Sequence, residues 1–444
     1  MRETLLSARE LAATALPFVA IAVGLIGAAY WVLEPQPPKR VVLATGPDNT
    51  AYAAFGERYA KELKRHGIEV VLRPTAGARE NVRLLRDPKQ DVSLAFAQGG
   101  ASEAARAVDE DQTGIPLVAL GSLFYEPVWI FYRAEAAKRL GPEATLTQLT
   151  QLRGWKVNTG ARGSGTPGLV RKLLQSNLME REELVRSSLD ETAGVVALLA
   201  GDIDATVLVS APESLMVQML LQTPGVKLFE FAQAEAYARR HGFLSPVTLA
   251  RGVADLTRDV PPHDVPMVAA VTSLVAREGT HPALVQLFVQ AAQRIHGSGG
   301  WVQRAGRFPA AQGAEYPLAR EAERWFRSGP PVLQRYLPFW MANLVDRMWV
   351  ALFSIIAVLI PLARVLPPLY QFRIRSRVFR WYRRLREVED SMREPGADRE
   401  ALIAELDRLD ASAERISVPL SYTDELYALR QNIALVRARL RAAP

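Results

Sequence analysis

The 23 residues from Leu11 to Leu33 contain no charged side chain. A helix needs about 20 consecutive apolar residues to cross the hydrocarbon core of a bilayer. Tyr30 and Trp31 stand near the end of this stretch, where interfacial aromatic residues are typical. A cleaved signal peptide would have an apolar region of only about 7–15 residues and a small-residue cleavage site. We therefore expect an uncleaved transmembrane helix at 11–33, preceded by a cytoplasmic N-terminus at 1–10.

A second apolar segment, Met348–Leu366, lies towards the other end of the chain. Its uncharged part is slightly short for a span, but Arg364 can reach the lipid headgroups. A buried core helix is the alternative. Between Arg364 and Arg386 there are eight arginines and no acidic residue, which is typical of the cytoplasmic side of a membrane. We expect a transmembrane helix at 346–367, with 368–444 in the cytoplasm and the long middle region outside.

The same arginines explain most of the basic character of the chain. The net charge is +7, and residues 364–444 contribute +4 of it, because they hold sixteen arginines and twelve acidic residues. We expect anionic lipids of the inner leaflet to contact this segment. The residues expected to make these contacts are Arg373, Arg375, Arg377 and Arg380. A basic segment beside a membrane span and without a recognition motif predicts no nucleic-acid partner.

The composition excludes several kinds of chemistry. The chain has no cysteine, which rules out thiolate metal sites, iron–sulfur clusters and cysteine nucleophiles. Its five histidines are scattered and form no close metal-binding pair. The acidic residues are also scattered, so no set of nucleophile, general base or metal ligands can be assembled from them. We expect neither an enzyme nor a site for a metal or cofactor.

Strands and helices alternate in the middle region, after a short proline-rich linker at 34–40. This alternation predicts a parallel α/β sheet with right-handed crossovers. The pattern changes at 117–132, where two apolar runs flank Tyr125-Glu126-Pro127, and then restarts. We therefore predict a two-lobed α/β domain over 41–335, with a ligand cleft between the lobes. Lobe 1 is expected at about 41–125 and 250–330, and lobe 2 at about 126–249.

The loop at 158–168 joins an expected strand to an expected helix and is the best candidate for a ligand site. Thr166 is the candidate N-cap of the helix. Gly163 and Gly165 would let backbone N–H groups approach a ligand, and the helix N-terminus favours an anion there. Arg162 could pair with the same anion. The glycine spacing also fits a dinucleotide fingerprint, but no clear strand ending in an acidic residue follows the helix.

Two other loops follow expected strands of the first lobe. Thr75 could cap the helix after the second strand, and Glu80 and Asn81 would project from its first turn. The alternative is an ordinary capped helix without a ligand. Gln98 stands at the carboxyl end of the third strand, where ligands bind in such sheets. We expect Gln98 to contact a ligand rather than to fill the core.

These landmarks occur in a characteristic order and spacing over about 40–330. They comprise Ala44-Thr45-Gly46 with Tyr52; Thr75-x-Gly77-x-x-Glu80-Asn81; Asp91 to Gln98; Leu120-x-Ser122-Leu123-x-x-Glu126; Leu152-Arg153-Gly154-Trp155-Lys156-Val157 with Gly163-Ser164-Gly165-Thr166; and Leu199-x-Gly201-Asp202-Ile203-Asp204-Ala205. In this respect the chain resembles the TAXI class of extracytoplasmic solute receptors, which serve tripartite (TRAP) carboxylate transporters.

The resemblance implies a type II periplasmic-binding-protein fold at the bacterial inner membrane, with TRAP membrane subunits as partners. Its ligand would be a small carboxylate, such as an amino or keto acid. Carried over by position, the ligand contacts would be Thr45, Tyr52, Asn81, Gln98, Ser164, Gly165 and Thr166. The physical argument above adds Arg162. Receptors of this class are usually soluble or lipid-anchored, whereas two membrane helices would hold this chain at both ends.

The C-terminal region predicts helices with a coiled-coil character. Apolar residues recur at a spacing of three and four, and they are Val378, Trp381, Leu385, Val388, Met392, Leu402, Leu406, Leu409, Leu426, Leu429, Ile433, Val436 and Leu440. Pro395-Gly396 and Pro419 would divide the region into three helices. We expect a helical hairpin or small bundle, which could also bind a helical partner or a second copy. A ligand-sensing or scaffold protein therefore stands as an alternative to a solute receptor.

Overall fold

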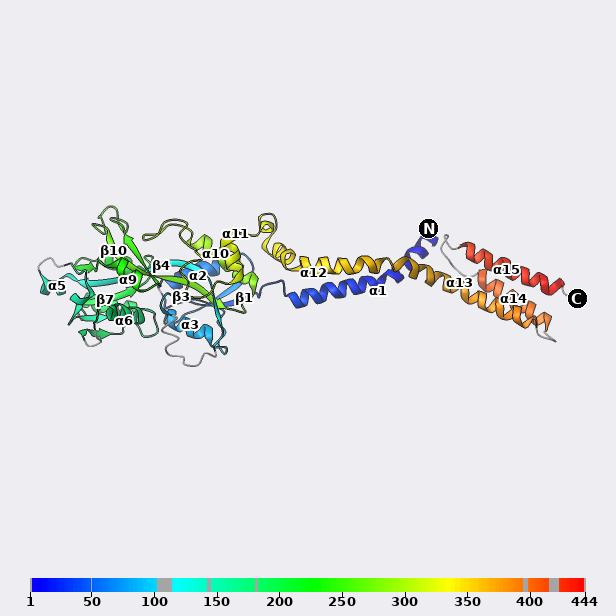
Figure 1. Cartoon of the computed structure of the whole chain (residues 1–444), viewed down its shortest axis with the longest axis horizontal. Helices are drawn as coiled ribbons and strands as arrows, with labels where there is room; N and C mark the ends of the chain where they lie inside the picture. Colours follow the sequence, from blue (N-terminus) through cyan, green and yellow to red (C-terminus); the bar gives the residue numbers. More distant parts are fainter. Residues whose placement is uncertain are drawn as a thin grey trace. The chain divides into compact units, whose positions relative to one another are not determined.

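The computed structural model describes residues 2–48, 50–101, 114–141, 145–179, 183–393, 398–414 and 423–442. The chain forms two units (Figure 1). We call Gln36–Asn343 the outer unit, and Met1–Pro35 together with Leu344–Pro444 the helical unit. Every described strand belongs to the outer unit, which therefore contains the two-lobed domain.

Lobe 1 is built around three parallel strands with helices on both faces. β1 (Arg40–Ala44) lies between β2 (Glu69–Arg73) and β3 (Leu94–Gln98) and pairs with both. Val41 and Leu43 of β1 face a core shared with α2 and α10, whereas Val42 and Ala44 face a core shared with α3. Successive strand residues point to opposite faces, so a strand that is apolar throughout requires a cover on each face. The helices of this lobe are α2 (Ala51–Lys64), α3 (Ala78–Arg86), α10 (Pro282–His296), α11 (Arg320–Ser328) and the 3-10 helix η4 (Val332–Arg335).

Lobe 2 repeats this construction. β5 (Lys156–Asn158) pairs in parallel with β6 (Val185–Ser187) and β7 (Ala205–Val209). One core holds α6 (Thr166–Ser176), and the core on the opposite face holds α7 (Glu191–Ala200). The other elements of the lobe are α5 (Ala134–Ala137), η1 (Lys138–Leu140), η2 (Leu149–Leu152), α8 (Leu215–Leu221), β8 (Val226–Leu228), α9 (Ala234–Arg240) and β9 (Leu244–Leu249).

Two long antiparallel strands belong to both lobes. β4 (Leu117–Arg133) pairs with β10 (Val265–Arg277) up to Pro127 and with β7 from Val128 onward. β10 first pairs with β9 and then, from Thr272, with β3. The principal strand order is β2-β1-β3-β10-β4-β7-β5-β6. The lobes are therefore joined through two neighbouring strands, which is an arrangement suited to hinge motion.

The predicted two-lobed α/β class is confirmed, with one difference in the hinge. The two apolar runs expected around Tyr125-Glu126-Pro127 form a single continuous strand, β4. A proline cannot donate a ladder hydrogen bond and is tolerated where strand pairing changes. Pro127 lies at the end of the pairing of β4 with β10. β10 passes from its pairing with β9, which ends at Ala270, to its pairing with β3, which begins at Thr272.

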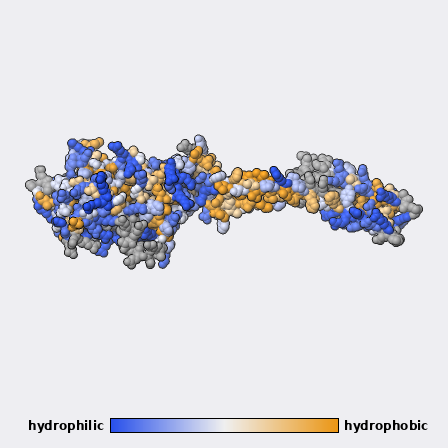
Figure 2. Space-filling model, viewed as in Figure 1, coloured by the Kyte–Doolittle hydropathy of each residue, from blue (hydrophilic) through white to orange (hydrophobic). Residues whose placement is uncertain are grey.

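Among the described residues, two helices are long and apolar enough to cross a membrane. α1 (Arg2–Leu33) contains the apolar stretch Ala15–Leu33, and α12 (Phe339–Ala363) begins the stretch Phe339–Leu369. Large apolar side chains on both are exposed, among them Trp31 (80%) and Phe353 (69%). Figure 2 shows hydrophobic residues gathered over these helices. An apolar surface of this extent is unusual for a protein in water, so both helices suit a membrane span by length and composition.

The predicted helical tail is confirmed, and its three helices share one apolar core. They are α13 (Leu366–Ser391), α14 (Arg399–Glu414) and α15 (Thr423–Ala442). The core is made from the predicted stripes, with Leu385, Val388, Leu406, Leu409, Leu429, Ile433, Val436 and Leu440 buried. The expected breaks at Pro395-Gly396 and Pro419 lie outside the described residues, as do the side chains of Arg373, Arg375 and Arg377.

Candidate functional site

A pocket with a cavity volume of ≈ 70 Å³ lies between the two lobes of the outer unit. Its walls come from the carboxyl ends of the parallel strands and from the helix starts that follow them, as expected for open α/β sheets. Lobe 1 contributes Pro47, Thr50, Ala51, Tyr52, Ala76, Gly77, Ala78 and Gln98; β4 contributes Glu126; and lobe 2 contributes Asn158, Gly160, Ala161, Ser164, Gly165, Thr166, Asp190, Glu191 and Val207–Ser210. The size suits a small molecule.

Five of the eight predicted site residues line this pocket. Tyr52 and Gln98 lie on the wall from lobe 1, and Ser164, Gly165 and Thr166 lie on the wall from lobe 2. They meet because the loops after parallel strands gather at one edge of each lobe's sheet. The three others, Thr45, Asn81 and Arg162, are not among the residues that line it.

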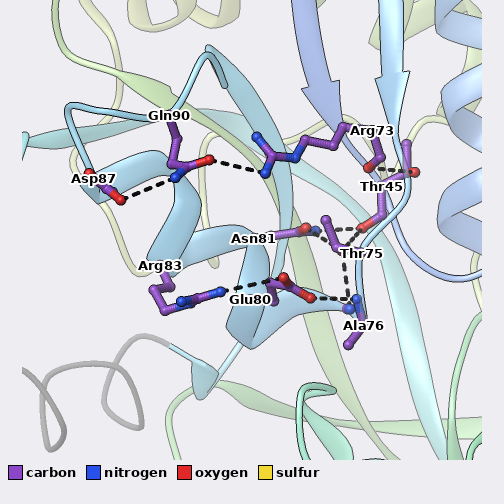
Figure 3. A network of polar contacts seen from close by, with 10 residues as sticks. Thr45, Arg73, Thr75, Ala76, Glu80, Asn81, Arg83, Asp87 and Gln90 are labelled. Atoms are coloured by element: carbon purple, nitrogen blue, oxygen red, sulfur yellow. Dashed lines mark hydrogen bonds and ion pairs between the residues drawn. The ribbon is translucent and has the colours of Figure 1, made fainter.

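Thr45 and Asn81 are buried behind the lobe 1 wall, where they bond to the protein itself (Figure 3). The Asn81 amide donates to the carbonyl oxygens of Thr45 (2.7 Å) and Phe96 (2.9 Å), and its Oδ1 accepts from the Thr75 hydroxyl (2.7 Å). Because the amide is fully used in joining β1, β3 and α3, Asn81 positions this wall instead of facing the pocket. Thr75 also does not cap α3 directly, since the N-cap is Gly77.

On the lobe 2 wall, α6 begins one residue earlier than expected. Gly165 is the N-cap and Thr166 is the first helical residue, so the predicted Thr166 cap is wrong by one position. The Ser164 hydroxyl donates to the carbonyl oxygen of Ala161 at 2.8 Å and closes the turn. Arg162 lies within this turn but is exposed, whereas its neighbour Ala161 lines the pocket. The turn therefore directs Arg162 to solvent, away from the pocket.

The two walls touch through residues with little or no side chain. The Glu80 N–H donates to the carbonyl oxygen of Gly163 at 3.4 Å, which links lobe 1 to lobe 2. A Cβ on Gly163 would collide with the Cβ of Ala76, and a Cβ on Gly77 would lie 3.2 Å from the Ser164 Cα. Gly77 also has a φ of 126°, a conformation that favours glycine. The closed cleft therefore depends on glycines on both sides.

A buried carboxyl group, which the sequence argument did not assign to the site, lies in the hinge. Glu126 of β4 is 3% exposed. Its Oε2 accepts hydrogen bonds from the Tyr52 hydroxyl (3.0 Å) and the Thr272 hydroxyl (2.5 Å). Burial raises the pKa of Glu126 to about 8, against the opposing effect of these hydrogen bonds, and the charge of Glu191 raises it further. A signal was available, since Glu126 is the one acidic residue within the apolar segment 117–132.

Two more carboxyl groups come from the start of α7. The Asp190 side chain caps this helix by accepting from the Ala193 N–H at 2.7 Å. Glu191 follows it, and its Oε2 is buried without a hydrogen-bond partner among the described residues. Burial, followed by the charge of Asp190, raises the pKa of Glu191 to about 7. The pocket is therefore lined by three carboxyl groups, two of which are partly or largely protonated near neutral pH.

Nothing in the described ranges groups three histidine, aspartate or glutamate side chains in a geometry that could hold a metal ion. The hydroxyl of Ser164 is bonded to a backbone carbonyl, and no histidine is among the described residues that line the pocket. The chemistry that these walls offer is hydrogen bonding and charge, which suits reversible binding of a small solute.

The mixed α/β fold and the interlobe pocket define a two-lobed protein of the periplasmic-binding-protein kind. Residues 43–328 match the NMT1-like family, and this match covers more than half of the chain. The chain belongs to the NMT1-like family. No curated protein is significantly similar to it.

Solved structures with low similarity include binding proteins and a regulatory domain. PhnD1 from Prochlorococcus marinus, in complex with methylphosphonate, is 13% identical, with 59% of this chain and 85% of that chain covered and a TM-score of 0.38. The periplasmic aliphatic sulphonate binding protein SsuA from Escherichia coli is 14% identical, with 72% and 83% covered and a TM-score of 0.37. The CcmR regulatory domain from Synechocystis PCC6803, in complex with 2-PG, is 14% identical, with 58% and 98% covered and a TM-score of 0.37.

Replacing Gly163 by alanine should hold the lobes apart, because the new Cβ would collide with Ala76. The chain has no native cysteine, so spin labels on Lys64→Cys and Arg171→Cys, one on each lobe, can report the interlobe distance. We expect a longer mean label distance in Gly163→Ala than in the parent. Gly242→Ala is the control, since nothing lies within 4 Å of a Cβ there. An unchanged distance in Gly163→Ala would contradict the contact.

The pKa of Glu126 predicts a pH-dependent gain in stability for Glu126→Gln. The folded protein keeps a proton on Glu126 up to about pH 8, whereas an unfolded carboxyl loses it near 4.5. The free energy of unfolding of the parent should therefore fall as pH rises through this interval. Glutamine stays neutral and can accept the same two hydrogen bonds. We expect Glu126→Gln to raise the melting temperature relative to the parent at pH 8 but hardly at pH 5, as measured by intrinsic fluorescence. Glu235→Gln, at an exposed position, should show no such trend.

Proposed function

We propose that this protein is a membrane-tethered extracytoplasmic solute receptor. The observation that carries the proposal is the pocket between the lobes, whose walls come from both lobes and from the hinge strand β4. A solute bound there would contact both lobes at once, so that its binding energy would favour the closed form.

The proposed membrane arrangement has two spans. α1 and α12 would cross the bacterial inner membrane, with both termini in the cytoplasm and the outer unit on the periplasmic side. The length and exposed apolar surface of both helices support this. Arg373, Arg375, Arg377 and Arg380 would then meet anionic lipids of the inner leaflet, since they follow the second span directly.

The resemblance to TAXI receptors suggests that the closed receptor presents its solute to the membrane subunits of a TRAP-type transporter. A small carboxylate, such as an amino or keto acid, would be the solute. One feature favours the alternative of a sensor or scaffold protein. The helices α13, α14 and α15 share an apolar core, and a receptor that only delivers a solute does not need such a cytoplasmic bundle. In that case, closure of the outer unit would be coupled to a helical partner or to a second copy.

The receptor proposal predicts saturable binding of a small organic solute. The full chain in detergent micelles would be titrated by calorimetry with amino acids, keto acids and short amines. We expect at least one of these solutes to bind with one site per chain. Gly163→Ala should weaken that binding, because it opposes closure, while Gly242→Ala should not. If none of these solutes binds, the proposal is contradicted.

The topology can be tested with single cysteines, since the chain has none of its own. Lys64→Cys lies on α2 of the outer unit, and Leu435→Cys lies on α15 at a position that is 51% exposed. In spheroplasts, a membrane-impermeant maleimide should label the cysteine at 64 directly and the cysteine at 435 only after permeabilisation. Labelling of both from the same side would refute the two-span arrangement.

A further inference from the structure

The charge of the pocket does not match a ligand recognised through a negative group alone. Glu126, Asp190 and Glu191 all line it. No lysine, arginine or histidine stands among the lining residues that the structure describes. Arg162, the cation expected to pair with an anionic ligand, is exposed outside the pocket. An anionic ligand would find no positive partner among these residues, and its charge would oppose ionisation of the carboxyl groups.

The pocket also holds acceptors that have no donor. The buried Oε2 of Glu191 has no hydrogen-bond partner in the described part of the chain. Both hydrogen bonds that Glu126 accepts go to Oε2, so its other oxygen can accept from a ligand once the group is ionised. Gln98 is 5% exposed and lines the same pocket, so its amide can also meet a ligand. Buried polar atoms are rarely left without partners in native proteins, and a ligand that supplies donors would satisfy these.

We propose that the pocket recognises its solute through a positively charged amino group, which binds among the carboxyl groups of Glu126, Asp190 and Glu191. This inference rests on the proposed receptor function and names the chemical group that the receptor selects. An ammonium group supplies three donors and one positive charge, which complements oxygens from β4 and α7. The solute is thereby an amine or an amino acid, and a keto or hydroxy acid of the same skeleton is excluded from tight binding.

The amino group is expected to bind more tightly as pH rises. The groups that face Glu126 are Tyr52 on α2, Thr272 on β10 and Glu191 on α7, and Glu191 in turn faces Asp190. None of these is basic. With a pKa of about 8 for Glu126 and about 7 for Glu191, a cation that binds at neutral pH displaces protons from the carboxyls. Affinity should therefore increase between pH 6 and pH 8 and level off above, where both carboxyls are already ionised.

The test compares matched pairs of probes on the full chain in detergent micelles. The pairs are L-alanine with pyruvate, L-glutamate with α-ketoglutarate, L-leucine with α-ketoisocaproate, and butylamine with butanol. In any pair that binds, the amino member should bind at least about 10-fold more tightly, since a lost charged hydrogen bond is worth this much. Calorimetry in buffers of different ionisation enthalpy should also show proton release at pH 7.

Two variants locate the amino group. Glu191→Gln and Glu126→Gln should each lower the affinity for the amino member of a pair by about 10-fold or more. Glu126→Gln should also reduce the pH dependence of that affinity. Melting curves confirm that each variant is folded. Glu235→Gln removes one exposed charge from lobe 2 and should leave the affinity unchanged.

The outcomes separate the two proposals. If no probe binds, the receptor function fails, and this inference fails with it. If keto acids bind as tightly as their amino partners, or if both pocket variants keep the parent's affinity for the amino member, the receptor function stands and the recognition of an amino group is overturned.

Discussion

The outer unit depends on one constraint, which is that β4 and β10 belong to both lobes. Because each strand continues from one sheet into the other, the lobes share two backbones. Glu126 lies in the first of these strands and Thr272 in the second, and the hydroxyl of Tyr52 reaches the same carboxyl from α2. The polar network of the pocket is therefore anchored in the hinge strands.

The features that could be predicted from the sequence are those with a local pattern. The alternation of apolar strands with amphipathic helices indicated two α/β lobes, and the spacing of leucines at three and four residues indicated the tail helices. Both predictions rest on the period with which side chains return to the same face of a helix or strand. This period can be recognised from neighbouring residues alone. This reasoning did not predict that β4 is continuous, because a proline within an apolar segment usually indicates the end of a strand. Only the exchange of pairing partners at Pro127 explains why the strand continues.

The candidate site was predictable in position but only partly in detail. Tyr52, Gln98 and the start of α6 line the pocket, because the carboxyl ends of parallel strands gather at one edge. Asn81 shows the limit of this rule, because its amide already donates hydrogen bonds to two carbonyl groups that are distant in the sequence. Which residue of a turn faces inward also depends on tertiary packing, and Ala161 takes the place expected for Arg162. The acidic residues of α7 gave no signal, because helix starts are commonly acidic.

The connectivity of the chain has a consequence for any partner that would distinguish conformations of the outer unit. The outer unit is entered through β1 and left through α11, and both belong to lobe 1. The chain enters lobe 2 along β4 and leaves it along β10, and after α10 it packs against the lobe 2 core once more, through Trp301, Val302 and Phe308. Lobe 2 is therefore held to the rest of the protein through lobe 1. A partner that contacts lobe 1 alone would meet the same surface in every state, so discrimination between the open and closed forms requires contact with lobe 2.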